Sequence, residues 1–230
     1  MKVYLDNNII IDIEKGKLKL PVDYIVEYPY SYVHIEELLE SGNRLSELKE
    51  VRFSTLASMS KNKYMFQENQ QICFVDKSPY EVYGLFNPLV MQVKKLIKDL
   101  SNNFNIDEEL KTKLEIDKNI INNLTVSELI KKYGSIIISY VTNTSSTLQE
   151  KFQSFFNILN AVGYWSDKAG KGSNLNRIYD ANHAFYASAC DYFVTNDKRT
   201  MMKANFLYKY YKTKTKALSF DEFLNILAKS

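Results

Sequence analysis

The chain has 230 residues, enough for one large domain or for one domain with a sizeable insertion. Its hydrophobic fraction of 45% argues against a chain that is disordered throughout, and its net charge of +3 is too small to indicate a nucleic-acid partner by itself. Cys73 and Cys190 are the only cysteines, which excludes a disulfide framework and a thiolate zinc site and favours buried free thiols in a reducing compartment.

The first element is a short buried strand predicted at Val3 to Leu5, which ends at Asp6. Asn7 or Asn8 could cap the helix that follows, and Gly16 ends that helix. Because Asp6 and two asparagines interrupt the apolar run, this segment lacks the core of a signal peptide. No later stretch approaches the roughly 20 apolar residues that span a bilayer. We therefore expect a soluble cytoplasmic protein with no membrane contact.

An extended segment follows over residues 23–32, with a strand that ends near Tyr30. Ser31 is a natural N-cap for a helix that carries Glu37, and a second helix is predicted from about Leu45 to Met59. Two runs of β-forming residues, separated by a polar tetrapeptide, then predict a hairpin with strands at Tyr64–Phe66 and Ile72–Val75.

The pattern from about 80 to 165 is mainly helical, and we interpret it as an insertion within a single domain that covers residues 1–230. One part of it, Gly134 to Tyr140, fits either a strand or the end of a helix. The polar segment from Ser166 to Asn174 is the clearest loop.

The end of the chain alternates helix, strand, helix, strand, helix. Asp180 lies early on the first of these helices, a buried strand follows at Tyr192–Val194, and Asp197 comes just after it. A short strand at Ala217–Leu218 precedes a final helix that Ser219 caps. Such alternation is typical of a parallel sheet with helices packed on it, so the predicted fold class is α/β.

Four acids are expected at one edge of this sheet. Ligands of such sheets bind outside the carboxyl ends of the strands, where Asp6 and Asp197 stand, and Asp180 and Glu37 lie early on neighbouring helices. Because like charges repel at close range, such a cluster is stable mainly when a cation neutralises it. Mg²⁺ and Mn²⁺ prefer oxygen ligands. Attack of a metal-activated water on a phosphodiester is the chemistry that needs this arrangement.

Each residue also has a simpler structural interpretation. Asp6 alone would be a helix cap, Glu37 a solvated acid of a first helical turn, and Asp180 a surface residue. His183 lies three residues after Asp180, on the same helical face. It is either a hydrogen-bonded structural residue or a residue that supports the acids or contacts a substrate phosphate.

Four segments together resemble the PIN-domain nucleases. Val3 to Ile10 has a strand followed by Asp and Asn, and Ser31 to Leu38 has a Ser with a Glu six residues later. Asp180 to Asp197 has an Asp-bearing helix, an apolar strand and a Thr-x-Asp ending. Ala217 to Leu227 has a closing strand and helix.

The resemblance implies a three-layer α/β/α sandwich with a central, mainly parallel sheet, to which the helical insertion is added. It also implies cleavage of single-stranded RNA that depends on Mg²⁺ or Mn²⁺, and many members of the family are toxins of toxin–antitoxin pairs. The catalytic and metal-binding quartet that it implies is Asp6, Glu37, Asp180 and Asp197. Asn8 and Thr195 would support these acids. The insertion could form a lid, a substrate platform, or the surface for a protein partner such as an antitoxin or another subunit of a complex.

A basic segment directly follows Asp197. Residues 198–216 contain seven Lys or Arg residues and no acid, with three tyrosines between them. Basic side chains could follow a phosphate backbone while tyrosines stack on unpaired bases, or the segment could be a solvated helix face and loop. Its position next to Asp197 favours substrate contact, and the candidate residues are Lys198, Arg199, Lys203 and Tyr208.

The leading hypothesis is a metal-dependent endoribonuclease that acts on single-stranded or structured RNA. A second hypothesis is a PIN-like interaction module with weak or no catalysis, and a third is a structure-specific DNA nuclease. Each is compatible with a homo-oligomer or with a protein partner.

Overall fold

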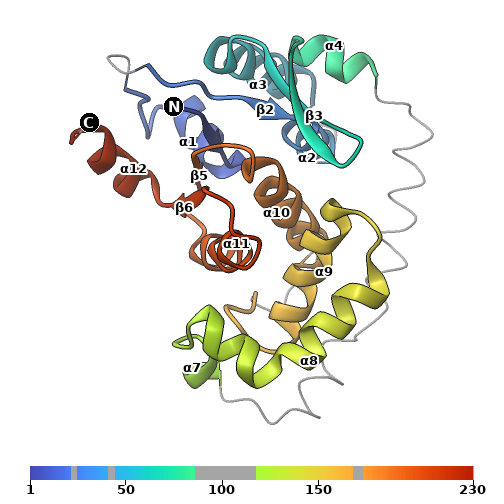
Figure 1. The fold of residues 1–230 in the computed structure, drawn as a ribbon. Coiled ribbons are helices and arrows are strands. Elements are labelled where there is room, and N and C mark those ends of the chain that lie inside the picture. The colour runs from blue at the N-terminus through green and yellow to red at the C-terminus, as the bar shows by residue number, and fades with distance from the viewer. Residues whose placement is uncertain (22–24, 41–44, 86–117, 168–172, 230) are drawn as a thin grey trace.

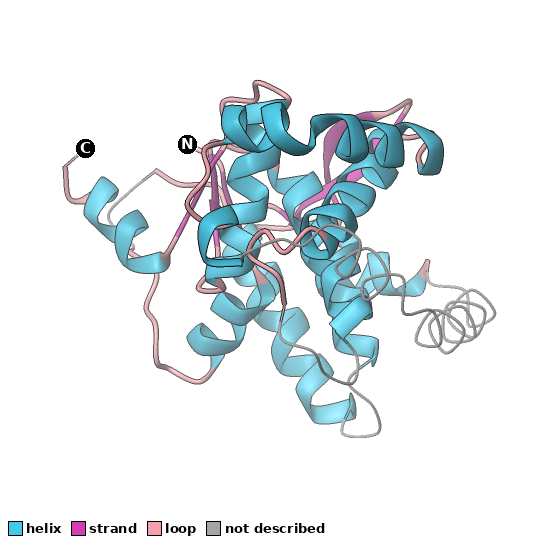
Figure 2. Ribbon diagram, turned by 90° about the horizontal axis from the view of Figure 1, so that it is seen from below, coloured by secondary structure: helices cyan, strands magenta, loops and turns pink. Residues whose placement is uncertain are grey.

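The computed structural model describes residues 1–21, 25–40, 45–85, 118–167 and 173–229 of the chain. Figure 1 shows the described elements, and Figure 2 shows the short strands lying between helices. In chain order the elements are β1 (Val3–Leu5), α1 (Asn7–Glu14), β2 (Tyr30–Ser31), α2 (Tyr32–Glu40), α3 (Leu45–Ser60), β3 (Lys63–Glu68), β4 (Gln71–Asp76), α4 (Pro79–Gly84), α7 (Lys118–Ile121), α8 (Val126–Thr144), α9 (Leu148–Ala161), α10 (Ser173–Ala187), β5 (Tyr192–Val194), α11 (Lys198–Tyr210), β6 (Lys216–Leu218) and α12 (Phe220–Leu227).

Strands β1, β5 and β6 form a parallel sheet in the order β1-β5-β6. Tyr4 lies opposite Phe193, and Phe193 opposite Ala217. The carboxyl ends of β1 and β5 lie side by side, since the N–H of Asp6 donates to the carbonyl of Val194 at 2.9 Å. The predicted parallel sheet of the α/β class is therefore confirmed, and its edge is where Asp6 stands.

A second sheet contains β2, β3 and β4, with β2 parallel to β3 and β3 antiparallel to β4. Asn69 and Gln70 connect β3 and β4 with φ angles of 48° and 66°. Two successive residues with positive φ are typical of the turns that close tight hairpins. The predicted hairpin is confirmed.

The two sheets meet at a single parallel bridge between Lys2 and Glu27. There the N–H of Val3 donates to the carbonyl of Glu27 at 2.8 Å. Pro29, two residues further on, has no N–H with which to extend this pairing. The described residues thus form two three-stranded sheets, and the three-layer sandwich around one central sheet stays a prediction.

Helices pack on both faces of the β1-β5-β6 sheet because side chains alternate along a strand. Tyr4 of β1 belongs to a hydrophobic cluster with the buried faces of α8, α9, α10 and α11. Val3 and Leu5 belong to a second cluster with α1, α2, α3 and α12. The sheet is therefore covered by helices on each side.

Part of the predicted insertion contributes to the first of these clusters. Gly134 to Tyr140 lies within the long helix α8, so this segment is neither a strand nor the end of a helix. Phe152 and Phe155 of α9 are each 1% exposed in that cluster. Residues 86–117 of the predicted insertion lie outside the described residues. No helix in the described ranges has the length and the apolar character needed to cross a membrane.

Both cysteines are free thiols. Cys190 is buried, as predicted, whereas Cys73 on β4 is only half-buried. Burial raises the pKa of the Cys190 thiol, which keeps it in the protonated, unreactive form. Cys190 is thus a core residue.

Helix α12 begins with a capping box. The hydroxyl of Ser219 accepts from the N–H of Glu222, and the Glu222 carboxylate accepts from the N–H of Ser219 at 2.8 Å. We predict that Ser219→Ala lowers the free energy of unfolding by about 1 kcal/mol, since the N-terminal N–H groups of α12 lose an acceptor. Urea unfolding measures this change. Ser127→Ala, at an exposed position of α8, is the control, and an equal loss in both variants would contradict the prediction.

Candidate functional site

Asp6 lies at the carboxyl end of β1 and caps α1. Its Oδ1 accepts from the N–H of Asn7 at 2.7 Å, so the prediction that Asn7 or Asn8 caps this helix is wrong. Its Oδ2 accepts from the hydroxyl of Thr195 at 2.6 Å and from the side-chain amide of Asn8 at 2.6 Å. Thr195 and Asn8, the two predicted supporting residues, therefore both contact Asp6.

The Asp6 side chain is buried, and its pKa is raised. Burial is the main cause, because it removes water from the charged form. His183 acts in the opposite direction, and the negative charge of Glu37 raises the pKa further. The carboxylates of Asp6 and Glu37 are thus close enough to repel each other.

Glu37 lies on α2, and its side chain keeps 37% of its surface exposed. Its Oε2 accepts from His183 Nε2 at 3.1 Å and from the side-chain amide of Asn7. Burial by itself would raise the pKa of Glu37, but the hydrogen bonds from His183 and Asn7 outweigh it and lower the pKa. Glu37 is therefore held in its charged form.

His183 of α10 lies on the buried side of Asp6 and Glu37 and contacts the Glu37 carboxylate. It is 1% exposed, and its Nε2 lies 3.1 Å from Glu37 Oε2 and 3.9 Å from Asp6 Oδ1. A histidine buried this deeply stands beneath the carboxylates and does not reach out toward a substrate. Of the predicted alternatives, the geometry favours the supporting contact over a contact with a substrate phosphate.

Asp180, also on α10, is influenced by the charges of two other predicted acids, Asp6 and Asp197. Burial raises its pKa well above the usual value, and the charges of Asp6 and Asp197 raise it further. Within the described residues its carboxyl makes no hydrogen bond and no ion pair. Asp180 is thus a partly buried carboxyl that has like charges nearby and lacks a direct partner.

Asp197 follows β5 and is the N-cap of α11. Its Oδ1 accepts from the N–H groups of Arg199 at 2.7 Å and Thr200 at 3.1 Å. Its own N–H donates to the hydroxyl of Thr195 at 3.1 Å, which links it to the residue that holds Asp6. The simpler interpretation of an acid after a strand, a helix cap, is therefore correct for Asp197 as well as for Asp6.

The four predicted acids come from four separate segments and influence one another in pairs: Glu37 acts on Asp6, and Asp6 and Asp197 each act on Asp180. Their oxygen atoms are the donors that Mg²⁺ and Mn²⁺ prefer, and the unpartnered carboxyl of Asp180 suits a hard cation. In the part of the chain that the structure describes, however, no three His, Cys, Asp or Glu side chains form a group that could hold a metal ion as they stand. Oxygens of Asp6, Glu37 and Asp197 are directed at protein N–H and O–H donors.

A fifth acid, Asp167, lies at the edge of this group and was not predicted. Its Oδ1 is 2.7 Å from Lys203 Nζ, its Oδ2 is 3.0 Å from Arg177 Nε, and its charge also raises the pKa of Asp180. In the sequence Asp167 is only one polar residue of the predicted loop. The only signal in the sequence is that Asp167 has a charge opposite to those of Arg177 and Lys203, and these residues lie 10 and 36 positions further along the chain.

Lys203 and Tyr208 were predicted to contact the substrate, and both predictions are wrong. Lys203 is 1% exposed and paired with Asp167, and Tyr208 is 2% exposed with its hydroxyl donating to the carbonyl of Ala184 at 2.8 Å. Neither side chain can reach a bound polymer. The reason is that α9 and α10 cover the face of α11 on which they lie.

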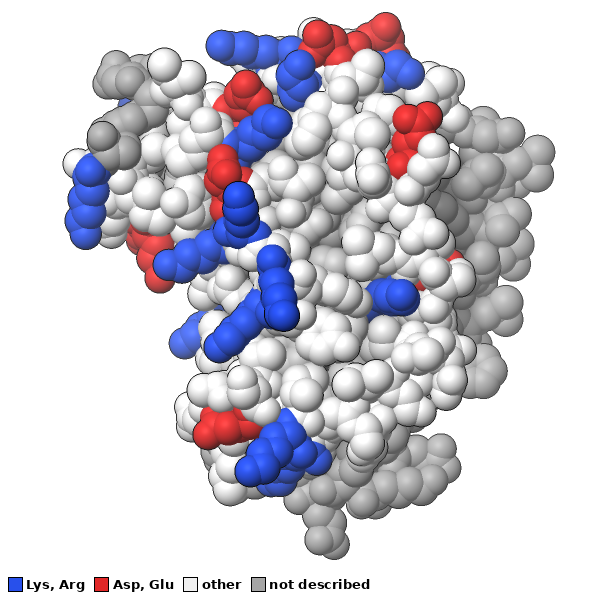
Figure 3. Space-filling model, viewed as in Figure 1, with Lys and Arg blue, Asp and Glu red and all other residues white. Residues whose placement is uncertain are grey.

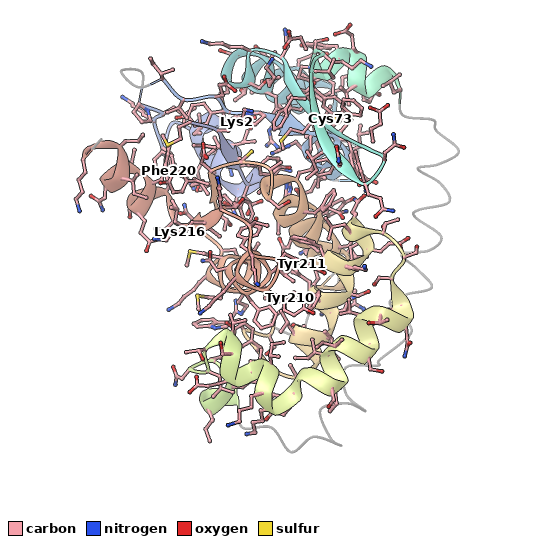
Figure 4. All side chains as sticks on the ribbon, viewed as in Figure 1. Lys2, Cys73, Tyr210, Tyr211, Lys216 and Phe220 are labelled. Carbon is pink, nitrogen blue, oxygen red and sulfur yellow. The ribbon has the colours of Figure 1, made fainter. Side chains whose placement is uncertain are left out.

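Two further tyrosines of this segment, Tyr210 and Tyr211, also belong to the interior packing (Figure 4). Tyr211 stacks on Phe152 with ring centroids 5.5 Å apart, and Tyr210 lies 4.9 Å from the ring of Phe155. These contacts join α11 to α9. Tyr208 is therefore buried in the protein core, whereas Tyr210 and Tyr211 are partly buried against it.

Lys198 and Arg199 remain as candidate substrate contacts at the start of α11. The Nζ of Lys198 lies 5.0 Å from the ring centroid of Trp165, and Arg199 Nε donates to the carbonyl of Ser166 at 3.0 Å. Figure 3 shows Lys and Arg side chains gathered on the face formed by α11, β5 and β6. A basic surface with a nearby aromatic ring thus lies beside Asp197.

A buried polar network behind the acids was also missed. The Tyr4 hydroxyl lies 2.6 Å from Ser31 Oγ and 2.9 Å from His183 Nδ1. His34 Nε2 donates to the carbonyl of Leu5 at 2.9 Å, and burial lowers the pKa of His34 to about 3, so this ring is neutral. Tyr4 sits in an apolar strand, where the sequence pattern indicates only a core residue.

The chain was compared with models of protein families, with curated proteins and with solved structures. None of the three comparisons found a match. The functional proposal below therefore rests on the residues and the geometry of this chain.

Proposed function

We propose that this protein is a PIN-like, divalent-metal-dependent endoribonuclease that hydrolyses phosphodiester bonds. The observation that supports it most strongly is that the charge of Glu37 acts on Asp6, which stands at the carboxyl end of a parallel strand. The charges of Asp6 and Asp197 both raise the pKa of Asp180, which has no hydrogen-bond or ion-pair partner among the residues that the structure describes. Like charges that lie close together destabilise a site, and Lys203 and His183 only partly offset them here, so a bound cation is the simplest reason for the arrangement.

In this proposal the carboxylates of Asp6, Glu37, Asp180 and Asp197 would hold Mg²⁺ or Mn²⁺. The metal supplies a water of lowered pKa and stabilises negative charge that develops on the phosphate. Hydrogen bonds from Thr195 and Asn8 orient Asp6. Hydrogen bonds from His183 and Asn7 orient Glu37. Lys198 and Arg199 contribute positive charge beside Asp197, where the phosphate backbone would lie.

The experiment that tests the proposal measures cleavage of end-labelled single-stranded RNA, single-stranded DNA and flap DNA by the purified protein. We expect cleavage of RNA with Mn²⁺ or Mg²⁺, none with EDTA, and recovery when metal is restored. Preference for flap DNA would transfer the proposal to a structure-specific DNA nuclease. Metal-independent cleavage, or no cleavage of any substrate, would contradict it.

A second proposal is a PIN-like interaction module without significant catalysis. Large apolar side chains are exposed on and just after α3 and α4, where Val51, Tyr80 and Leu85 keep 52%, 45% and 66% of their surface. Such side chains are typical of a surface that binds another protein. A stable complex whose formation is lost in Val51→Lys, together with no metal-dependent cleavage, would favour this second proposal.

A further inference from the structure

A chain of buried hydrogen bonds reaches Glu37 from the outer helix α3. Arg52 of α3 forms a two-pronged ion pair with Glu14 of α1, with Nη2 to Oε2 at 3.0 Å. Arg52 Nη1 donates to Asn7 Oδ1 at 2.9 Å, and the Asn7 amide donates to Glu37 Oε2. Asn7 and Arg52 are 4% and 6% exposed, so the bond between their side chains is shielded from water.

The chemistry of these side chains fixes which group donates and which accepts in each of the hydrogen bonds from Arg52 through Asn7 to Glu37. A guanidinium has only N–H donors, so the side-chain oxygen of Asn7 must face Arg52. The Asn7 amide group then necessarily faces Glu37 as a donor. Because Glu14 holds Arg52 with a planar, two-pronged contact, the orientation of the Asn7 amide is set by residues far from the acids.

The donors converge on one oxygen of Glu37. Asn7 Nδ2 and His183 Nε2 both contact Oε2, and they come from α1 and α10 on different sides of the residue. No hydrogen bond to Oε1 is found within the described residues. The carboxylate is thus held by one oxygen while the other stays free.

We propose that Asn7 and Arg52 are positioning residues that orient Glu37 and leave its Oε1 for a divalent cation, an inference that rests on the proposed metal site. Outer residues that hold a metal ligand typically change metal affinity by about 10- to 100-fold when they are replaced. Arg52 acts only through Asn7, since it does not itself contact Glu37.

The test measures the Kd of the purified protein for Mn²⁺ by isothermal titration calorimetry, with no nucleic acid present. We expect Asn7→Ala to weaken Mn²⁺ binding by about tenfold or more. The double variant Arg52→Gln/Glu14→Gln, which leaves no charge unpaired, is expected to weaken it by a similar or smaller factor. Added to Asn7→Ala, that double change should cause no further loss, because Arg52 then has nothing left to orient.

The matched control is Asn205→Ala. Asn205 makes two hydrogen bonds of 2.8 Å to the backbone of Ala217 on β6, so its loss destabilises the fold without touching Glu37. We expect a lower melting temperature and an unchanged Kd for Mn²⁺ in this variant. An unchanged Kd in Asn7→Ala, or equal weakening in Asn205→Ala, would overturn the positioning role. Independent, additive losses from Asn7 and Arg52 would overturn the relay, whereas failure of the unmodified protein to bind Mn²⁺ would overturn the proposed function itself.

Discussion

Asp6→Asn is expected to reduce metal-dependent RNA cleavage at least about 1,000-fold in kcat/KM, which corresponds to about 4 kcal/mol of transition-state stabilisation. The carboxylate of Asp6 is central to the group, because its charge affects the pKa of Asp180 and is affected by Glu37. An amide has the same shape but no negative charge, so a cation loses its most buried oxygen ligand. Steady-state cleavage of labelled RNA with Mn²⁺ measures the effect.

The fold should survive this substitution. Asparagine is as good an N-cap as aspartate, so its side-chain oxygen can still accept from the N–H of Asn7, and its NH2 group can donate to the Thr195 hydroxyl. Circular dichroism and the melting temperature verify this. Asp12→Asn is the control, since Asp12 pairs only with the exposed Lys17 and should leave cleavage unchanged. Full activity of a folded Asp6→Asn protein would rule out the metal mechanism.

Asp180→Asn is expected to stabilise the metal-free protein at pH 7 to 8 by about 1 to 2 kcal/mol. The pKa of Asp180 is raised in the folded state, chiefly by burial and then by Asp6 and Asp197. A folded protein with such an acid binds more protons than the unfolded chain, so its stability falls as the pH rises from about 4 through the raised pKa. The neutral amide removes this decline.

The measurement is the melting temperature from pH 4 to pH 8, with EDTA and with Mn²⁺. Without metal, Asp180→Asn should melt about 2 to 4 °C higher per kcal/mol at pH 8 and show a flatter pH profile. With Mn²⁺ the difference in melting temperature between the two proteins should become smaller or change sign, because only the unmodified protein gains the full stabilisation of ligand binding. Asp76→Asn, in an exposed ion pair on the hairpin, should change neither profile. A destabilised Asp180→Asn protein without metal would contradict the expectation.

The sequence predicted the elements that depend on local patterns. The strand at Val3–Leu5, the β3–β4 hairpin and the cap at Ser219 each follow from residues that are neighbours in the chain. The position of Asp6 and Thr195 at adjacent strand ends follows from the alternation of helices and strands, although 189 residues separate them. The contact between Asp6 and its supporting residue Thr195 could therefore be predicted.

Contacts between distant segments could not be predicted. Lys203 and Tyr208 follow Asp197 closely in the sequence, but whether they face water depends on how α9 and α10 pack on α11. Arg52 and Asn7 lie 45 residues apart, and nothing in either local pattern indicates that they meet. Asp167 likewise becomes part of the group only because α10 and α11 bring Arg177 and Lys203 to it.

The order β1-β5-β6 also has a consequence for synthesis of the protein on the ribosome. The strand that carries Asp6 is made first, but β5, with which it pairs in that sheet, begins at Tyr192. Until that segment has been translated, Asp6 lacks Thr195, and Asp197 does not yet exist. Under the proposed function, a nascent chain could not cleave RNA, including the message being translated, until the segment that carries Thr195 and Asp197 has left the ribosome.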